Sequence, residues 1–131
     1  MNQGIIAVGS NFGDREAHVR GAIEYLRSLA ITAEFTEIYE SPDHYGTTAA
    51  YMNAIVRLET SLAEKELNRL CKCFETEAGR TLERRRRGEV PVDIDIVVWN
   101  HEVKKPDDFK ASYFKEGFRR FQENLAEVNG R

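Results

Sequence analysis

The segment Val92-Asp93-Ile94-Asp95-Ile96 alternates β-branched apolar residues with aspartates, and this pattern indicates a β-strand. Successive side chains of a strand point to opposite faces, so the apolar residues face one side and both carboxylates face the other. Asp is depleted in strands, and like charges on one face repel each other. Two aspartates in this arrangement therefore favour a bound metal cation, and an exposed strand face with solvated charges is the alternative.

Just before this strand, five arginines lie close together: Arg80 and Arg84-Arg85-Arg86-Arg87. Guanidinium groups bind phosphate oxygens, and carboxylates bind Mg²⁺. These are the groups that phosphoryl transfer requires. Taken alone, the arginine run is equally consistent with a solvated loop, but its position beside the aspartates favours the phosphate interpretation.

The rest of the sequence predicts the element order βαββαβ. Apolar residues recur with the helical period over 14–30, and Ser61-Leu62-Ala63-Glu64 has the pattern of a capping box that begins a second helix, which ends near Gly79. The expected strands before the aspartates cover 4–8, 31–40 and 51–60. This order is typical of an α+β, ferredoxin-like fold, in which two helices cover one face of an antiparallel sheet.

Strand alternation also predicts which residues share a face. The helices are expected to cover the face that carries Met52, Ala54, Val56, Leu58, Val92, Ile94, Ile96 and Val98. The opposite, open face then carries Tyr51, Asn53, Asp93 and Asp95, together with the apolar residues Ile55, Val97 and Trp99. Apolar residues on an open face need a cover, which is either a substrate or another segment. The loop over 41–50 is long and lacks periodicity, and it is expected to fold over this face.

Composition argues against several other classes of function. The chain of 131 residues is the size of one domain, and its net charge of −3 gives no general reason to expect nucleic-acid or membrane partners. No apolar run approaches the roughly 18 residues of a membrane span, so a cytoplasmic location is expected. An RNA-binding module of this fold would carry basic and aromatic residues on the sheet face where this chain has two aspartates.

A C-terminal helix with an aromatic stripe is predicted after Pro106-Asp107-Asp108. Its apolar residues recur at helical spacing: Phe114, Phe118, Phe121, Leu125 and Val128. The stripe is expected to pack onto the same domain or to form a contact between two copies, which leaves a monomer and a homodimer as alternatives. The chain is thus expected to be a single domain over 1–131, with a ferredoxin-like core at 1–103 and a helical extension at 104–131.

Several short segments together point to one enzyme family. They are Ala7-Val8-Gly9-Ser10-Asn11, Ile38-Tyr39-Glu40-Ser41-Pro42, Tyr51-Met52-Asn53-Ala54, Leu58-Glu59-Thr60-Ser61-Leu62, Glu75 with Gly79-Arg80, and Val92-Asp93-Ile94-Asp95-Ile96. Over about residues 4–102 the chain resembles the 6-hydroxymethyl-7,8-dihydropterin pyrophosphokinase (HPPK) family of folate biosynthesis. The resemblance implies transfer of pyrophosphate from ATP, as the co-substrate with two Mg²⁺ ions, to the pterin hydroxymethyl group, with release of AMP.

The resemblance also assigns roles to individual positions. Asp93 and Asp95 match the family's Mg²⁺ ligands. The positions that match its pterin site are Ser41, Pro42, Tyr51 and Asn53. Arg80 and Arg86 match its catalytic arginines, which bind the ATP phosphates, and Arg84 and Arg87 are further candidates for binding ATP. Small-molecule substrates are the partners that these roles imply.

The chain departs from the family pattern at two places. The family usually has Arg-Trp-Gly-Pro-Arg before the aspartate strand, whereas this chain has Arg86-Arg87-Gly88-Glu89-Val90, so that an arginine important for catalysis is replaced by Val90. The aromatic helix stands in place of the family's C-terminal segment, and Gly117-Phe118 is its nearest match to a phenylalanine that stacks on the pterin. A divergent ligand-binding protein that has lost the transfer step is therefore the alternative to an active pyrophosphokinase.

Overall fold

An antiparallel sheet forms the centre of the computed structural model, which describes residues 1–42 and 50–129, with side chains up to Phe121 in the last helix. The predicted loop residues 43–49 and the side chains of Leu125 and Val128 lie outside the described residues. The sheet has six strands: β1 (Asn2–Ser10), β2 (Thr32–Phe35), β3 (Tyr39–Ser41), β4 (Tyr51–Thr60), β5 (Asp93–Trp99) and β6 (Glu102–Val103). Their order is β2-β4-β1-β5-β6, and β3 also pairs with β4. The segment 31–40, which was predicted as one strand, thus forms two short strands, β2 and β3, that both pair with β4.

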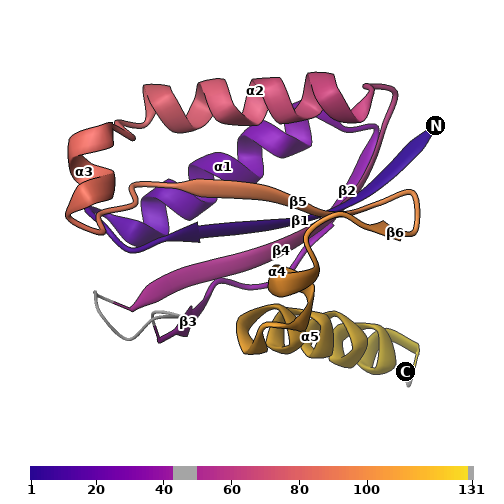
Figure 1. Ribbon diagram of the computed structural model, residues 1–131. Helices are drawn as coiled ribbons and strands as arrows, with labels where there is room; N and C mark the ends of the chain where they lie inside the picture. Colours follow the sequence, from indigo (N-terminus) through magenta and orange to yellow (C-terminus); the bar gives the residue numbers. More distant parts are fainter. Residues whose placement is uncertain (43–49, 130–131) are drawn as a thin grey trace.

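Two layers of helices enclose the sheet (Figure 1). Helices α1 (Arg15–Leu29) and α2 (Glu64–Glu77) cover one face, and α4 (Pro106–Lys110) and α5 (Ser112–Asn129) lie on the other. The short helix α3 (Leu82–Arg86) stands at the end of the sheet where β5 begins. The predicted α+β class with an antiparallel sheet is confirmed. No helix in the described part of the chain is long and apolar enough to cross a membrane.

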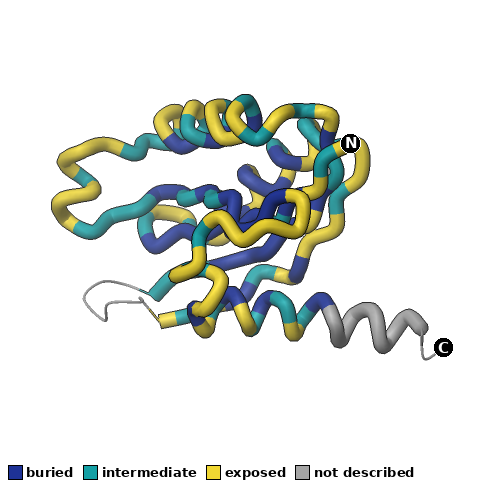
Figure 2. Tube along the Cα trace, turned by 45° about the vertical axis from the view of Figure 1, so that its right-hand side comes forward, coloured by how far each residue is buried: buried dark blue, intermediate teal, exposed yellow. Residues whose placement is uncertain are grey.

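The larger core lies between the sheet and the pair α1 and α2, and buried residues concentrate along the central strands (Figure 2). Strand alternation assigned its sheet residues correctly as far as Ile96. The buried members of this core are Ile6, Val8, Val19, Ala22, Ile23, Leu26, Ala54, Val56, Leu58, Leu67, Cys71, Val92, Ile94, Ile96 and Trp99.

A β-bulge changes the alternation near the end of β5. Two consecutive residues of β1 pair with Ile96 and Val98, so Val97 is an extra residue in the ladder. Beyond the bulge Val98 belongs to the cluster on the open face, and Trp99 packs into the core under α1 and α2. The predicted faces of these two residues were wrong because an inserted residue reverses the alternation that follows it.

Two predicted local structures also differ. Helix α2 begins after Ala63, whose backbone is extended and whose side chain makes no capping hydrogen bond, so the predicted capping box at Ser61 does not form. The arginine run is helix α3 and not a loop, because the Thr81 hydroxyl accepts a hydrogen bond from the Arg84 amide at 3.1 Å and caps it. The helix ends before Gly88, which has a φ of 73°.

The aromatic stripe of α5 packs on the open face of the sheet in the same chain. Phe114 and Phe121 are buried there, and Phe118 is partly buried beside them. Gly117 allows this close approach, since a Cβ at this position would lie 2.1 Å from Ile55 Cγ1 on β4. The cluster consists of Ala7, Ile55, Val97, Val98, Phe114 and Phe121. Of the two predicted partners for the stripe, the described residues therefore satisfy the intramolecular one.

Candidate functional site

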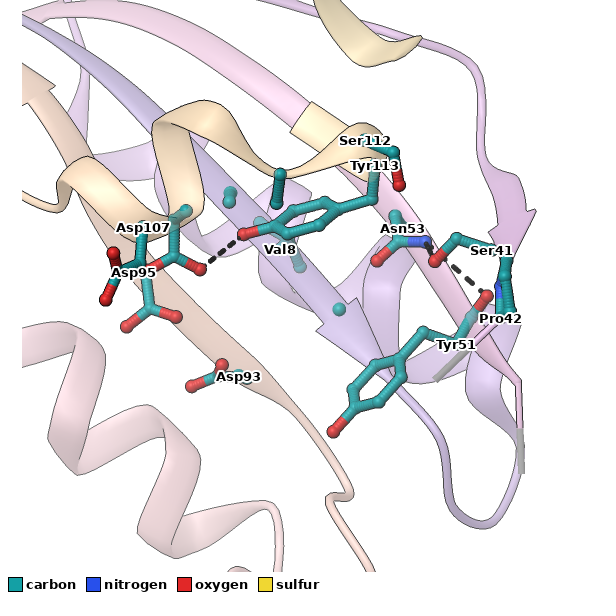
Figure 3. A pocket seen from close by; sticks show the side chains of 14 residues that line it. Val8, Ser41, Pro42, Tyr51, Asn53, Asp93, Asp95, Asp107, Ser112 and Tyr113 are labelled. Carbon is teal, nitrogen blue, oxygen red and sulfur yellow. Dashed lines mark hydrogen bonds between the residues drawn. The ribbon is translucent and has the colours of Figure 1, made fainter. Parts of the chain in front are cut away.

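A cavity of about 510 Å³ lies between the open sheet face and the α4–α5 segment (Figure 3). Carboxylates gather at one end of it, Asn53, Ser41 and Tyr51 lie at the other, and the ring of Tyr113 stands between them. Its lining comprises Ala7, Val8, Gly9, Ser41, Pro42, Tyr51, Asn53, Asp93, Asp95, Asp107, Asp108, Ala111, Ser112 and Tyr113. The structure thus brings together the predicted metal-binding and pterin-binding positions.

Asp93 and Asp95 each contact a cationic side chain of the protein. Arg80 Nη1 donates a hydrogen bond of 2.8 Å to Asp93 Oδ1. Lys105 Nζ donates one of 2.5 Å to Asp95 Oδ1, and Lys72 Nζ lies 3.7 Å from the same oxygen. Each carboxylate therefore has a cationic partner that the strand pattern alone did not reveal.

The two carboxylates share their charge unequally. Burial and the neighbouring Asp95 raise the pKa of Asp93 to about 7, against the opposing effect of Arg80. Burial also acts to raise the pKa of Asp95, but hydrogen bonds from Asp93 and Lys105 outweigh it and lower that pKa below its ordinary value. The arrangement fits one proton held between two close carboxylates near neutral pH, and a cation bound by both would replace that proton.

Glu75 supports the pair from the side of α2. Its buried carboxylate accepts hydrogen bonds from the Ile94 amide at 2.8 Å, from Lys72 at 2.9 Å and from Arg80 at 2.9 Å. It thereby binds the edge of β5 and holds Arg80 against Asp93. Leu67, Cys71 and Glu75 follow one another at four-residue intervals on the buried side of α2. An acidic residue on the buried side of a helix is the sequence signal that could have identified Glu75 as a support of the site.

At the other end of the cavity, β4 and β3 hold a polar group and an aromatic ring. Asn53 is buried, and its Nδ2 donates a hydrogen bond of 2.6 Å to Ser41 Oγ. Gly9 leaves room for this arrangement, because a Cβ there would lie 3.2 Å from Asn53 Oδ1 and 3.3 Å from the ring of Tyr51. The hydrogen bond to Ser41 therefore holds the Asn53 amide in place in the wall of the cavity.

The C-terminal segment supplies lining residues that the sequence did not identify. The Tyr113 hydroxyl donates a hydrogen bond of 2.6 Å to Asp108 Oδ1, which orients the ring over the cavity. Burial and this bond raise the pKa of Tyr113. Phe118, the predicted counterpart of the stacking phenylalanine, instead packs among the apolar residues under α5. A packing position and a ligand position look alike in a periodic aromatic stripe, so no sequence signal separated them.

The predicted arginines divide into two groups. Arg80 reaches the aspartates, whereas the α3 arginines do not line the cavity in the described structure. Arg84 lies over the ring of Phe12 at 4.9 Å, and Arg87 forms ion pairs with Glu83 and Glu89. Arg86 is exposed. The partners of Arg84 and Arg87, which are Phe12, Glu83 and Glu89, do not line the cavity.

The carboxylates of Asp93 and Asp95 have the donor chemistry that a divalent cation requires. Mg²⁺ binds through one or two carboxylates and completes its shell with water and substrate phosphates. Asp93 and Asp95 meet this requirement as hard oxygen donors on one strand face beside a cavity. Among the described residues, no group of three or more His, Cys, Asp and Glu side chains could hold a metal ion by itself. The pair therefore fits an ion that is held jointly with a phosphate ligand.

Comparison with known protein families gives one match that spans most of the chain. The family model described as 7,8-dihydro-6-hydroxymethylpterin-pyrophosphokinase (HPPK) matches residues 5–118. The match includes both ends of the cavity and the first part of α5.

Individual relatives agree with that match. The 2-amino-4-hydroxy-6-hydroxymethyldihydropteridine pyrophosphokinase of Bacillus subtilis (strain 168) is 40% identical over 104 residues, which cover 77% of this chain and 62% of that protein. The protein of the same name from Aquifex aeolicus (strain VF5) is 33% identical over 99 residues, or 75% of this chain and 61% of that protein. The mitochondrial folate synthesis bifunctional protein of Pisum sativum is 34% identical over 97 residues, which cover 72% of this chain and 19% of that protein. The chain thus spans less than two thirds of the length of these relatives.

Proposed function

The chain belongs to the HPPK family, and from this membership we propose that it transfers pyrophosphate from MgATP to 6-hydroxymethyl-7,8-dihydropterin and releases AMP. The observation that carries the proposal is a cavity with the Asp93–Asp95 carboxylate pair at one end and a buried amide with aromatic rings at the other. The first end suits a polyphosphate with its cation, and the second suits a flat heterocycle with hydrogen-bonding edges.

At the phosphate end, Asp93 and Asp95 would hold Mg²⁺ together with the ATP phosphates. Bound there, the ion supplies charge neutralisation and orientation of the phosphate oxygens. Arg80 donates hydrogen bonds to both Glu75 and Asp93 and so keeps Asp93 in place, and we propose that its other N–H groups bind a phosphate oxygen directly. The α3 arginines would have to turn towards the cavity when the nucleotide binds, and we propose Arg86, with Arg84 and Arg87, for this contact.

At the pterin end, Asn53 would bind the polar edge of the ring, and Ser41 and Pro42 would border it. Tyr51 and Tyr113 provide the aromatic surfaces that line the cavity, so we assign the stacking position to Tyr113 and not to Phe118. The hydroxymethyl oxygen of a ring bound in this way would point along the sheet towards the aspartates. Catalysis would then consist of positioning the hydroxymethyl oxygen in line with the β-phosphorus.

A ligand-binding protein without the transfer step remains the second candidate, and one observation favours it. Position 90 holds a valine whose amide donates a hydrogen bond to Asn11 Oδ1 at 2.6 Å, so it brings no charge to the phosphates. The two candidates differ in one product, because only the enzyme forms AMP.

The test measures AMP and binding in the same preparation. Purified protein is incubated with MgATP and 6-hydroxymethyl-7,8-dihydropterin, and calorimetry with a non-hydrolysable ATP analogue follows binding. AMP that forms only with the pterin present, and that is lost in Asp95→Asn but not in the exposed control Glu24→Gln, supports the enzyme. Binding without AMP supports the second candidate, and failure of both measurements contradicts the proposal.

A further inference from the structure

The ammonium group of Lys105 contacts Asp95, one of the two carboxylates that we propose hold Mg²⁺. Its Nζ is 2.5 Å from Asp95 Oδ1, at the cavity end where the carboxylates gather. Sequence patterns gave Lys105 no role, since it precedes α4 in a short polar connection.

The cations around the carboxylate pair are held in different ways. Lys72 is anchored on α2, where its ammonium donates to Glu75 at 2.9 Å and to the Ile94 carbonyl at 3.0 Å. Arg80 is likewise held by Glu75. Among the described contacts, Asp95 is the only hydrogen-bond partner of the Lys105 ammonium, and 42% of this side chain is exposed. Lys105 is therefore the cation that can leave without breaking a second bond of its own.

The backbone of Lys105 belongs to the C-terminal segment that closes the cavity. Its amide donates to the Val97 carbonyl at 3.3 Å, and its carbonyl accepts the Phe109 amide at 2.9 Å, the first turn of α4. Asp108 in the same turn accepts the Tyr113 hydroxyl bond. Contacts thus run from Asp95 through Lys105 and the first turn of α4 to the aromatic ring over the cavity.

We propose that Lys105 is a built-in counterion that competes with a divalent cation for Asp95, and that its release loosens the first turn of α4. That the competing ion is Mg²⁺ rests on the proposed function. Competition between Lys105 and a divalent cation for Asp95 can be measured whether or not the protein transfers pyrophosphate. A divalent ion at the pair must displace Lys105 and meets the positive charges of Lys72 and Arg80, which Glu75 holds in place. It therefore binds weakly alone and better with anionic phosphates beside it. The arrangement would couple metal occupancy to the nucleotide and to the segment that carries Tyr113.

Direct binding of Mn²⁺, without nucleotide or pterin, tests the competition. Electron paramagnetic resonance of free Mn²⁺ gives the affinity for the parent and for Lys105→Met, which removes the charge and keeps an unbranched side chain. The affinity of Lys105→Met is expected to rise about tenfold. Lys110→Met removes the same charge from an exposed position at the end of α4 and should leave the affinity unchanged. Lys105→Arg keeps the charge and should bind no more strongly than the parent.

Hydrogen exchange provides a second readout. Saturating Mn²⁺ should increase exchange over 105–110 in the parent, whereas Lys105→Met should show fast exchange there with and without the ion. An unchanged or weaker Mn²⁺ affinity in Lys105→Met, or an equal increase in Lys110→Met, would overturn the proposal. Circular dichroism confirms that each variant is folded. These results do not depend on AMP formation, so failure of pyrophosphate transfer would leave them interpretable.

Discussion

Replacing Gly117 with alanine tests how closely α5 must approach the sheet. The added Cβ would lie 2.1 Å from Ile55 Cγ1 and 2.7 Å from the Tyr39 hydroxyl oxygen. Carbon atoms in contact are about 3.5–4.0 Å apart, so the helix would have to retreat by on the order of 1.5 Å. Ile55 is fully buried, and its Cβ would also lie 3.2 Å from the added carbon, so rotation about χ1 would relieve the clash only in part.

The cost of this retreat has identifiable parts. The Tyr39 hydroxyl donates a hydrogen bond of 2.6 Å to the Tyr113 carbonyl, and the shift would stretch that bond. Phe114 and Phe121 would lose contact with the sheet cluster. Overpacking of this kind costs about 1–3 kcal/mol, and the higher helix propensity of alanine returns about 0.5–1 kcal/mol. We expect a net loss of about 1 kcal/mol in the free energy of unfolding, or a Tm lower by roughly 3–5 °C.

Gly21 in α1 provides the matched control. A Cβ there meets Phe74 Cζ at 3.8 Å, an ordinary contact, so Gly21→Ala should gain the propensity term and stabilise the protein by about 0.5–1 kcal/mol. Thermal and urea unfolding followed by circular dichroism measure both variants. If Gly117→Ala is as stable as Gly21→Ala, α5 does not pack on β4 as described, and the intramolecular cover of the open face is wrong.

Further predictions concern charge, the C-terminal segment and the arginines. The pKa of Asp93 is raised to about 7, so the metal-free folded state binds more protons than the unfolded state between about pH 4 and 7. The free energy of unfolding should fall by about 1–2 kcal/mol as pH rises through that range, after allowance for the partial exposure of Asp93. Urea unfolding at a series of pH values should show a weaker dependence of this free energy on pH in Asp93→Asn. Truncation after Lys105 should expose the cluster under α5 and cost several kcal/mol; a shortened protein that stays monomeric and equally stable would contradict the packing. Hydrogen exchange over 80–91 should slow when MgATP binds, and equal exchange in both states would leave α3 as a surface helix without a phosphate role.

Alternation along the strands predicted much of the candidate site. Two-residue periodicity is a local property, so the sequence alone was enough to put Asn53 and Asp93 on one face, and the cavity confirms their juxtaposition. The same periodicity failed after Val97 because a bulge depends on how two strands pair and not on one strand's residues. The division into a core over 1–103 and an extension over 104–131 stays a prediction.

Long-range contacts were the part that local patterns could not supply. Lys105 reaches Asp95 from the segment that follows β6. Tyr113 lines the cavity only because α5 returns across the open face of the sheet. That return depends on a glycine opposite Ile55, a complementarity between distant residues. The arginine run was predicted as a loop and instead forms helix α3, which Thr81 caps by accepting a hydrogen bond from the Arg84 amide. Its role in binding phosphate stays a prediction.

The register of β1 explains why the two halves of the site stay at a fixed separation. Gly9 pairs with Asn53 on β4 and with Asp93 on β5, so the amide and the carboxylate belong to strands on either side of one glycine. Two strand spacings place these residues about 9–10 Å apart, and this distance does not depend on the positions of the helices. That distance suits a small bicyclic ring whose substituent reaches towards the carboxylates. A side chain at position 9 would press on Asn53 Oδ1 and the Tyr51 ring and fill the floor between the halves. The sheet therefore sets the separation that the proposed transfer requires, and α4 and α5 cover the cavity between the two halves.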